Sequence, residues 1–301
     1  MSGINDSQLL DAFEKAAAES ALSKNVIENF LTVHREIAQW LNHKQEGKSP
    51  FILGINGAQG AGKSTFSKFA ALAQQVLYNK SVLVLSIDDL YLTKQERVEL
   101  GKAQHPLLVT RGVPGTHDLR LGQSLLTQLR TANAASETLI PRFDKGVDDR
   151  LPKDQWDSFT GKPDILIIEG WCIGARPQAK EDLATPVNRL ESQEDKDLLW
   201  RSYVNDRLQH EYADFFNSFD ALLMLKVPSF VKVLEWRQLQ EDKLRVRSDG
   251  AAVMSKEQIE RFIQHYERIT LDGLNVLPGL ADVVIPINED HSLGSPGFKD
   301  H

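Results

Sequence analysis

The sequence predicts an α/β fold, with a doubly wound, mainly parallel five-stranded sheet flanked by helices. Five short apolar runs are typical of strands buried on both faces: 51–56, 81–87, 165–168, 221–227 and 282–287. At least one helical or irregular stretch separates each run from the next, which provides the crossovers that parallel strands need. Ligands of such sheets bind beyond the carboxyl ends of the strands, so the residues that follow each strand are the first candidates for a site.

The composition limits the class of protein. The 301 residues, 41% hydrophobic and 26% charged, suffice for a substantial core. The net charge of −7, without a basic tail, argues against a nucleic-acid partner. No apolar run is as long as a membrane helix, which needs about 18 residues, and the start of the chain has no signal-type apolar block. With a single cysteine, Cys172, we expect a soluble, cytoplasmic protein, and the sequence leaves its oligomeric state open.

We expect one domain over residues 1–301, with four parts around the sheet. Apolar residues at three- and four-residue intervals predict helices without chemistry within 1–46. The interval 88–163 is rich in Gly and Pro, and long loops of this kind are often functional, so we expect the acceptor site there. The charged stretch 178–217 predicts a peripheral helical insertion, and 232–254 predicts a helical lid.

The most specific motif is GAQGAGKS at 57–64, which fits the phosphate-loop pattern G-x-x-x-x-G-K-[ST]. It stands between a predicted strand and a predicted helix, where glycines let successive N–H groups surround a phosphate. The expected nucleotide-binding residues are Gly57, Ala58, Gln59, Gly60, Ala61, Gly62, Lys63, Ser64 and Thr65. In this arrangement Lys63 reaches the β- and γ-phosphates of ATP, and the Ser64 hydroxyl is a ligand of Mg²⁺.

Acidic residues follow two of the predicted strands. Asp88 and Asp89 come directly after 81–87, where a carboxylate could take the proton of an acceptor hydroxyl as it attacks the γ-phosphate. Because neighbouring residues at a strand end face opposite ways, we expect one of them in the cleft and favour Asp88. A solvated loop entrance is the alternative. Glu169, after 165–168, is in the position of a second Mg²⁺ ligand and completes the catalytic set of Asp88, Lys63 and Glu169.

Two blocks join rigid turn residues to cations. They are RGVPGTHD at 111–118 and PRFDK at 141–145. An arginine holds a planar carboxylate through two hydrogen bonds, so Arg111, Arg142 or Arg120 could neutralise an acidic acceptor. His117 could bind an acceptor hydroxyl, although a histidine beside a helix start is as often structural.

The helix expected after 221–227 carries further cations and runs into a predicted mobile segment at 248–250. A closing lid would bring these cations over the phosphates and exclude water. We expect Arg237 to contact the nucleotide, and Lys243, Arg245 and Arg247 are further candidates. A solvated charged helix face is the alternative.

Five blocks keep a fixed order along the chain: the phosphate loop, S-x-D-D-x-Y at 86–91, RGVPGTHD at 111–118, PRFD at 141–144 and EGWC-x-G at 169–174. Together they resemble the D-glycerate 3-kinase family, within the phosphoribulokinase, uridine kinase and pantothenate kinase clan. The resemblance spans roughly residues 50–290. It implies a P-loop NTPase fold and transfer of the ATP γ-phosphate to a small hydroxylated acceptor. It also implies that Asp88 is the base and that Glu169 assists the metal. We expect Tyr91, in the block at 86–91, to belong to the acceptor site.

Three functions remain open from the sequence. The first is Mg²⁺-dependent phosphorylation of D-glycerate by ATP to give 3-phosphoglycerate. The second is the same chemistry on another acceptor, such as a nucleoside, a pantothenate-like acid or a sugar. Four aromatic residues could form the stacking wall that a nucleoside needs: Tyr91, Phe143, Trp156 and Trp171. The third is a switch protein that hydrolyses ATP to change partners.

Overall fold

The sheet of the computed structural model contains the five predicted parallel strands and a sixth at its edge. The structure describes residues 2–20, 22, 24–247 and 254–299. The strands are β1 (Phe51–Gly57), β2 (Val82–Ser86), β7 (Ile165–Gly170), β8 (Ala221–Lys226), β9 (Val283–Pro286) and β10 (Gly297–Phe298). Their order is β10-β9-β8-β1-β7-β2, with β10 antiparallel to β9 and the other pairs parallel. The α/β prediction is confirmed, while β10 lies in a tail from which the sequence predicts no strand.

The register of the parallel strands brings the predicted site segments to one edge. Glu169 of β7 is the partner of Ile55 in β1 and of Ser86 in β2. The phosphate loop leaves β1 two residues after Ile55, and Asp88 follows Ser86 by two residues. Glu169 therefore lies between the two segments, as expected at the carboxyl edge of a doubly wound sheet.

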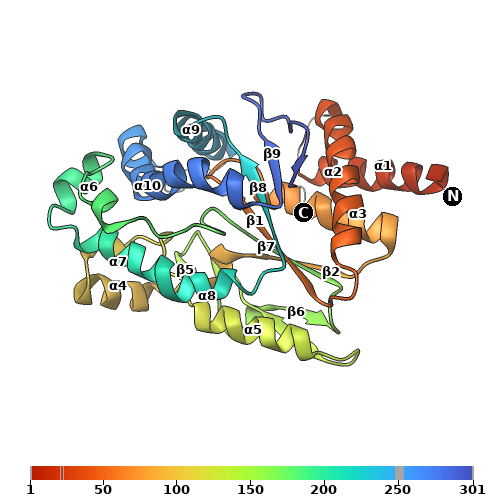
Figure 1. Cartoon of the computed structure of the whole chain (residues 1–301), viewed down its shortest axis with the longest axis horizontal. Coiled ribbons are helices and arrows are strands. Elements are labelled where there is room, and N and C mark those ends of the chain that lie inside the picture. Colours follow the sequence, from red (N-terminus) through yellow and green to blue (C-terminus); the bar gives the residue numbers. More distant parts are fainter. Residues whose placement is uncertain (1, 21, 23, 248–253, 300–301) are drawn as a thin grey trace.

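Helices cover both faces of the sheet, and each face has its own core (Figure 1). On one face lie α1 (Ser2–Glu19), α2 (Lys24–Lys44) and α3 (Lys63–Tyr78). On the other lies α5 (Leu119–Thr131) with the helices before β8. Alternate residues of β1 divide between the two cores, with Leu53 in the first and Ile52 in the second. The first two helices are thus packing elements, in agreement with the sequence.

The interval between β2 and β7 is more ordered than the sequence predicts. It contains η1 (Ile87–Leu90), α4 (Lys94–Ala103), η2 (Pro106–Val109), α5, and η3 (Lys153–Gln155). Two short antiparallel pairs also form. β4 (Phe143–Asp144) and β5 (Asp149–Arg150) make a hairpin, which lies in the chain between β3 (Glu137–Ile140) and its partner β6 (Asp157–Thr160). The expectation of a loop with one helix omits α4. That helix begins with a capping box between Thr93 and Glu96, which is visible in the sequence as T-x-x-E.

The segment 178–217 is helical, but it is not peripheral. Its elements are η4 (Lys180–Leu183), α6 (Arg189–Glu194), α7 (Leu199–Arg207), the π-helical turn η5 (Leu208–Tyr212) and α8 (Ala213–Phe216). Leu208, Tyr212 and Phe215 are at most 2% exposed and belong to the core that contains α5. The high charge density obscures these apolar residues, because they are spaced along one side of successive short helices.

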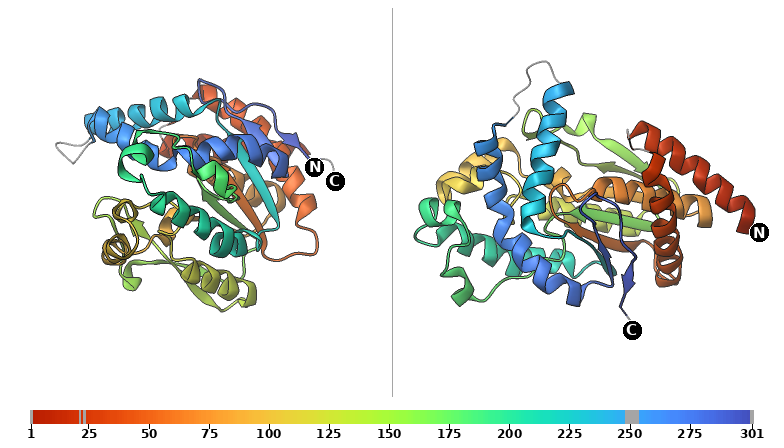
Figure 2. Two further views of the ribbon diagram at one scale, coloured as in Figure 1. Left: turned by 60° about the vertical axis from the view of Figure 1, so that its left-hand side comes forward. Right: turned by 90° about the horizontal axis from the view of Figure 1, so that it is seen from above.

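After β8 the chain forms α9 (Phe230–Arg247), and α10 (Lys256–Leu280) then leads to β9. The two helices lie side by side (Figure 2). The predicted mobile segment 248–250 lies outside the described residues, and so do the side chains of Lys243, Arg245 and Arg247. Within the part of the chain that is described, no helix is long and apolar enough to cross a membrane.

Candidate active site

The phosphate loop takes a conformation that only glycine adopts without strain. Gly60 and Gly62 have φ angles of 80° and 79°, in the left-handed region. A Cβ atom at Gly60 would also lie 2.9 Å from Cβ of Trp236, so α9 packs closely against the loop. Lys63 begins α3 and turns back over the loop, where its Nζ donates a hydrogen bond of 3.2 Å to the carbonyl of Ala58. The loop and the helix N-terminus together are suited to bind a phosphate.

Ser64 and Glu169 meet as the sequence predicts. The Ser64 hydroxyl donates a hydrogen bond of 2.6 Å to Oε1 of Glu169, whose side chain is buried at the end of β7. Both are oxygen donors, which Mg²⁺ prefers. Among the described residues no three His, Cys, Asp or Glu side chains gather into a metal site. A magnesium ion held here would therefore take its other ligands from phosphates and water.

The two neighbouring aspartates turn to different partners. Asp88 accepts a hydrogen bond of 2.6 Å from the Tyr91 hydroxyl at Oδ1, and its Oδ2 pairs with Nζ of Lys145 at 2.6 Å. Asp89 accepts hydrogen bonds from the Phe143 N–H at 3.1 Å and from Nη1 of Arg142 at 3.0 Å. Asp89 thus ties the hairpin of β4 and β5 to η1, whereas Asp88 holds its carboxylate between two side chains.

These surroundings shift the two pKa values in opposite directions. Burial raises the pKa of the Asp88 carboxyl, but Lys145 and the Tyr91 hydroxyl outweigh it, so that the pKa lies below its usual value. Burial raises the pKa of Asp89 above its usual value, and its two donors offset this only in part. At neutral pH, Asp88 is therefore a carboxylate that is ready to accept a hydrogen bond.

Two of the three predicted acceptor arginines, Arg111 and Arg142, pair with carboxylates of the protein. Arg142 also pairs through Nε with Asp157 at 2.6 Å, in addition to its bond with Asp89. Arg111 pairs with Asp148, and its guanidinium lies 5.6 Å from the centre of the Phe143 ring. Arg120 is exposed on α5.

The cation that reaches Asp88 is instead Lys145, between β4 and β5. Lys145 belongs to the predicted PRFDK block, although the sequence singles out only the arginine of that block. A further cation that the sequence does not single out, Arg97 of α4, is 1% exposed and pairs with Asp148 at 3.0 Å. Neither contact has a local signal, because each depends on how the hairpin folds back over η1.

Tyr91 and His117 lie together in the interior beside Asp88. The two rings are 4.7 Å apart between centroids at an interplanar angle of 31°, and their backbones form an antiparallel bridge. Nδ1 of His117 lies 2.5 Å from the hydroxyl of Tyr212, and its Nε2 is buried without a hydrogen-bond partner among the described residues. Burial lowers the pKa of His117 to about 4, so the ring is neutral at pH 7.

The remaining predicted residues lie around this centre. Trp171 donates a hydrogen bond of 2.9 Å from Nε1 to the carbonyl of Gly112, which joins the EGW and RGVPG blocks. Cys172 is fully buried and burial raises the pKa of its thiol, so this side chain packs in the core. The guanidinium of Arg237 on α9 lies 5.9 Å from the centre of the Phe262 ring on α10. Its contact with a nucleotide stays a prediction.

Chemically, the arrangement places a phosphate-binding loop, an oxygen pair for a cation and a buried carboxylate at neighbouring strand ends. These are the parts of a site in which a hydroxyl oxygen attacks a terminal phosphate and gives its proton to a carboxylate. The aromatic residues around the carboxylate pack mainly against one another.

Comparisons with known proteins agree with this geometry. No protein-family model matches the sequence. The uncharacterized kinase mug58 of Schizosaccharomyces pombe is 36% identical over 231 residues, which cover 74% of this chain and 80% of that protein. The chloroplastic D-glycerate 3-kinase of Arabidopsis thaliana is 29% identical over 227 residues, which cover 72% of this chain but 46% of that protein.

The fold also has a solved relative. The structure of D-glycerate 3-kinase from Cryptococcus neoformans matches 88% of this chain and 99% of its own with a TM-score of 0.72, at 20% sequence identity. At that identity the likeness concerns the fold alone, while the fission-yeast kinase shows the family. The chain therefore belongs to the glycerate kinase-like family of P-loop kinases, which are ATP-dependent phosphotransferases with an alcohol group as acceptor.

Proposed function

We propose that the protein phosphorylates D-glycerate at its terminal hydroxyl, with Mg-ATP as donor and 3-phosphoglycerate as product. The observation that carries this proposal is the contact between Asp88 and Lys145, 2.6 Å apart. It places an ammonium group, which can bind a carboxylate, directly beside the carboxylate that would act as base. A small hydroxy acid has the two groups that this pair requires, a carboxylate and a primary hydroxyl.

In the proposed reaction the glycerate hydroxyl oxygen forms the new bond to the γ-phosphorus, and the bond from that phosphorus to the β-phosphate oxygen breaks. Asp88 takes the hydroxyl proton, and ADP leaves. Lys63 and the loop from Gly57 to Thr65 hold the phosphates. Ser64 and Glu169 would hold Mg²⁺, which supplies positive charge to the phosphate oxygens when bound. Arg237 would reach the nucleotide from the lid.

Lys145 and His117 are the proposed acceptor contacts, with Tyr91 orienting the Asp88 carboxylate. Arg111 and Arg142 would join the acceptor site only by exchanging their present carboxylate partners for the substrate. In the conformation described here they hold the acceptor loops in place, because each bridges two segments of the interval between β2 and β7.

A nucleoside acceptor is less well supported. Stacking a base requires an open aromatic face, whereas Tyr91, Phe143 and Trp171 are at most 8% exposed. Their rings contact other residues: Tyr91 packs on His117 and Phe143, and Trp171 packs edge-on against Tyr266 at 4.8 Å. This favours a small acid over a base-containing acceptor.

The decisive experiment measures ADP release with D-glycerate, L-glycerate, pantothenate, uridine, fructose and no acceptor. We expect D-glycerate to give the greatest stimulation and the phosphate to appear on the terminal carbon by ³¹P NMR. Stimulation by pantothenate, uridine or fructose instead would reassign the acceptor. ATP hydrolysis that no acceptor stimulates would favour the switch protein. Lys63→Ala should abolish turnover in each of the kinase cases, because it removes the phosphate contact.

A further inference from the structure

Tyr212 connects the helical insertion to the acceptor site. It is fully buried at the end of η5, a π-helical turn, and such turns are frequent at functional sites. Its hydroxyl accepts a hydrogen bond of 2.9 Å from the N–H of Gly115 and lies 2.5 Å from Nδ1 of His117. Gly115 and His117 both belong to the RGVPGTHD block, so one hydroxyl holds two points of that block.

The hydrogen-bond inventory decides which nitrogen of His117 carries the proton. The Gly115 N–H can only donate, so the Tyr212 oxygen is its acceptor. The tyrosine has one proton of its own, and with Nδ1 as acceptor both the hydroxyl proton and the Nδ1 lone pair are satisfied, which leaves Nε2–H as the one group of this contact without a partner in the described part of the chain. If Nδ1 carried the proton instead, the tyrosine oxygen would accept twice and its own proton would have no partner among the described residues. The neutral ring therefore carries its proton on Nε2.

Nε2 is the nitrogen that lacks a partner. His117 is 4% exposed, and an unpaired N–H at such a site is costly unless a ligand or water accepts it. Nε2 lies on the side of the ring away from Tyr212, and the ring itself packs on Tyr91, whose hydroxyl binds Asp88. The Nε2–H donor thus belongs to a ring that packs on the tyrosine bound to the proposed base.

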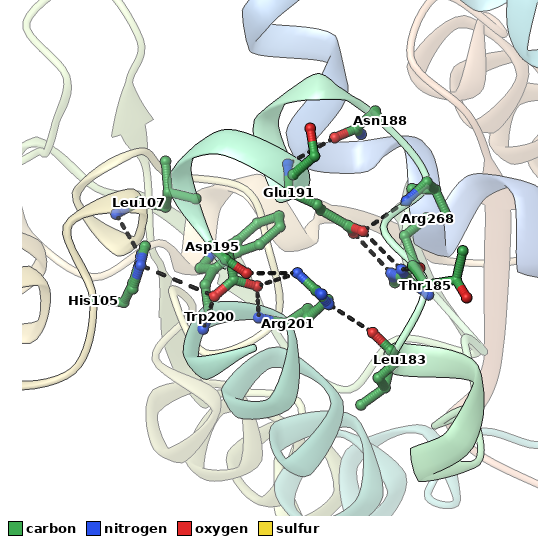
Figure 3. Close-up of polar contacts among 12 residues, drawn as sticks. His105, Leu107, Leu183, Thr185, Asn188, Glu191, Asp195, Trp200, Arg201 and Arg268 are labelled. Atoms are coloured by element: carbon green, nitrogen blue, oxygen red, sulfur yellow. Dashed lines mark hydrogen bonds and ion pairs between the residues drawn. The ribbon is translucent and has the colours of Figure 1, made fainter. Parts of the chain in front are cut away.

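The insertion is anchored firmly enough to fix this donor. Two ion pairs with nearly or fully buried partners hold the insertion in place: one lies within it, and the other joins it to α10 (Figure 3). Arg201 of α7 pairs with Asp195 at 2.9 Å, and Arg268 of α10 pairs with Glu191 of α6 at 2.7 Å. α7 continues directly into η5, so these pairs also determine where Tyr212 lies.

We propose that Tyr212 is a positioning residue of the acceptor site: its hydroxyl sets the tautomer of His117, so that the Nε2–H donates to an oxygen of the acceptor. This makes the helical insertion part of the acceptor site. The inference rests on the proposed function, because it assigns His117 to acceptor binding.

The first test observes the tautomer without any substrate. In protein labelled with ¹⁵N-histidine, long-range ¹H–¹⁵N correlation separates Nδ1–H from Nε2–H rings, and the His117 signals are those lost in His117→Gln. We expect the Nε2–H form in the native protein and a mixture of forms in Tyr212→Phe. An Nδ1–H ring in the native protein would overturn the role of Tyr212. Tyr203→Phe is the matched control, because this tyrosine also lies against Gly115 but its hydroxyl has no hydrogen bond to the described residues.

The second test separates positioning from folding. In Tyr212→Phe we expect the KM for D-glycerate to rise about tenfold, with kcat and the KM for ATP within about twofold of native. In the His117→Gln background the same change should have no further effect, because Tyr212 acts through His117. If Tyr212→Phe raises the KM for D-glycerate as much in the His117→Gln background as in the native protein, its role is structural and the proposal is overturned. An equal rise in the KM values for D-glycerate and for ATP would have the same meaning. If no acceptor stimulates the native enzyme although the ring is in the Nε2–H form, the proposed function fails and His117 has no acceptor to bind. An Nδ1–H ring in an enzyme that D-glycerate stimulates would instead contradict only the proposed role of Tyr212 and leave the proposed function standing.

Discussion

At the scale of single residues, the neighbouring aspartates after β2 give the sharpest prediction. Asp88→Asn should lower the rate of phosphoryl transfer by about 10²–10⁴-fold, because an amide cannot take the acceptor proton. The affinity for ATP should be nearly unchanged, since the phosphate loop is intact. Single-turnover transfer to D-glycerate and direct titration with ATP measure the two quantities separately.

Asp89→Asn is the matched control for this change. Asp89 accepts from the Phe143 N–H and from Arg142, and an amide oxygen can keep one of these bonds. Burial already raises the pKa of Asp89, so the loss of its charge should cost less than the loss of the Asp88 charge. If Asp89→Asn lowers the rate of phosphoryl transfer more than Asp88→Asn does, the base has been assigned to the wrong residue.

Lys145 gives the second prediction at this scale. Lys145→Ala should raise the KM for D-glycerate by roughly 10- to 100-fold, the effect of losing a charge-assisted hydrogen bond. The pKa of Asp88 should rise, because Lys145 is the main group that lowers it. The acid limb of the kcat/KM profile should therefore move to higher pH.

A pH profile of the variant against the native enzyme checks both parts of this prediction. Lys153→Ala, an exposed lysine in the same interval, is the control and should leave the profile unchanged. A large effect of Arg142→Ala on KM with none of Lys145→Ala would instead support the arginine that the sequence singles out.

At the scale of elements, the ion pair between α10 and α6 gives a prediction for stability. Glu191 is fully buried and its two oxygens bind Arg268 at 2.7 Å each. Arg268→Met should lower the free energy of unfolding by about 3–5 kcal/mol, because it leaves a buried carboxylate unpaired. The double variant Arg268→Met/Glu191→Leu should recover most of that loss. Urea unfolding measures both.

The same helix provides the control. Arg261 pairs with Glu194 at 2.6 Å, but both side chains are largely exposed, and such a pair contributes about 0–1 kcal/mol. Arg261→Met should therefore change the free energy of unfolding by less than about 1 kcal/mol. If Arg268→Met and Arg261→Met lower the free energy of unfolding equally, burial does not make the first ion pair more important for stability than the second.

The elements also show which parts of the site the sequence can predict. The pairing of Ser64 with Glu169 follows from two local signals, a phosphate loop and an acidic strand end, because parallel strands bring their carboxyl ends to one edge. The contact between Lys145 and Asp88 depends on how a hairpin folds over η1, which no local pattern encodes. Tyr212 and His117 are 95 residues apart. The tyrosine lies in a charged segment of several short helices, in which apolar residues do not recur at helical intervals over a long stretch, so the sequence contains no signal for this contact.

The predictions about the lid concern a segment that the structure describes only in part. The predicted lid at 232–254 includes most of α9, which packs on the phosphate loop through Trp236, but residues 248–253 after this helix lie outside the described residues. Closure of the lid and the contact of Arg237 with a nucleotide stay predictions. The existence of α9 can be predicted from topology, since a helix after a buried parallel strand is the usual crossover.

At the scale of the whole molecule, three buried histidines make stability depend on pH. His34 lies on α2 and contacts Phe66 of α3, His117 lies in the proposed acceptor site, and His265 lies on α10. Burial lowers the pKa of each ring to about 4 in the folded protein. The unfolded chain therefore binds more protons between about pH 6.5 and 4, so the free energy of unfolding falls as the pH falls through this window.

From pH 7 to pH 5 we expect each of these histidines to remove about 2 kcal/mol from the free energy of unfolding. Urea unfolding at the two pH values measures the total difference in unfolding free energy. His34→Gln should reduce this difference by the contribution of one histidine, about 2 kcal/mol. His43→Gln, at an exposed position of the same helix, should leave the difference unchanged. Burial raises the pKa of Asp89, Glu267 and Asp272, which act in the opposite direction, and the comparison therefore stops at pH 5. Equal unfolding free energies at pH 7 and pH 5 would mean that the buried rings are charged in the folded protein, contrary to their surroundings.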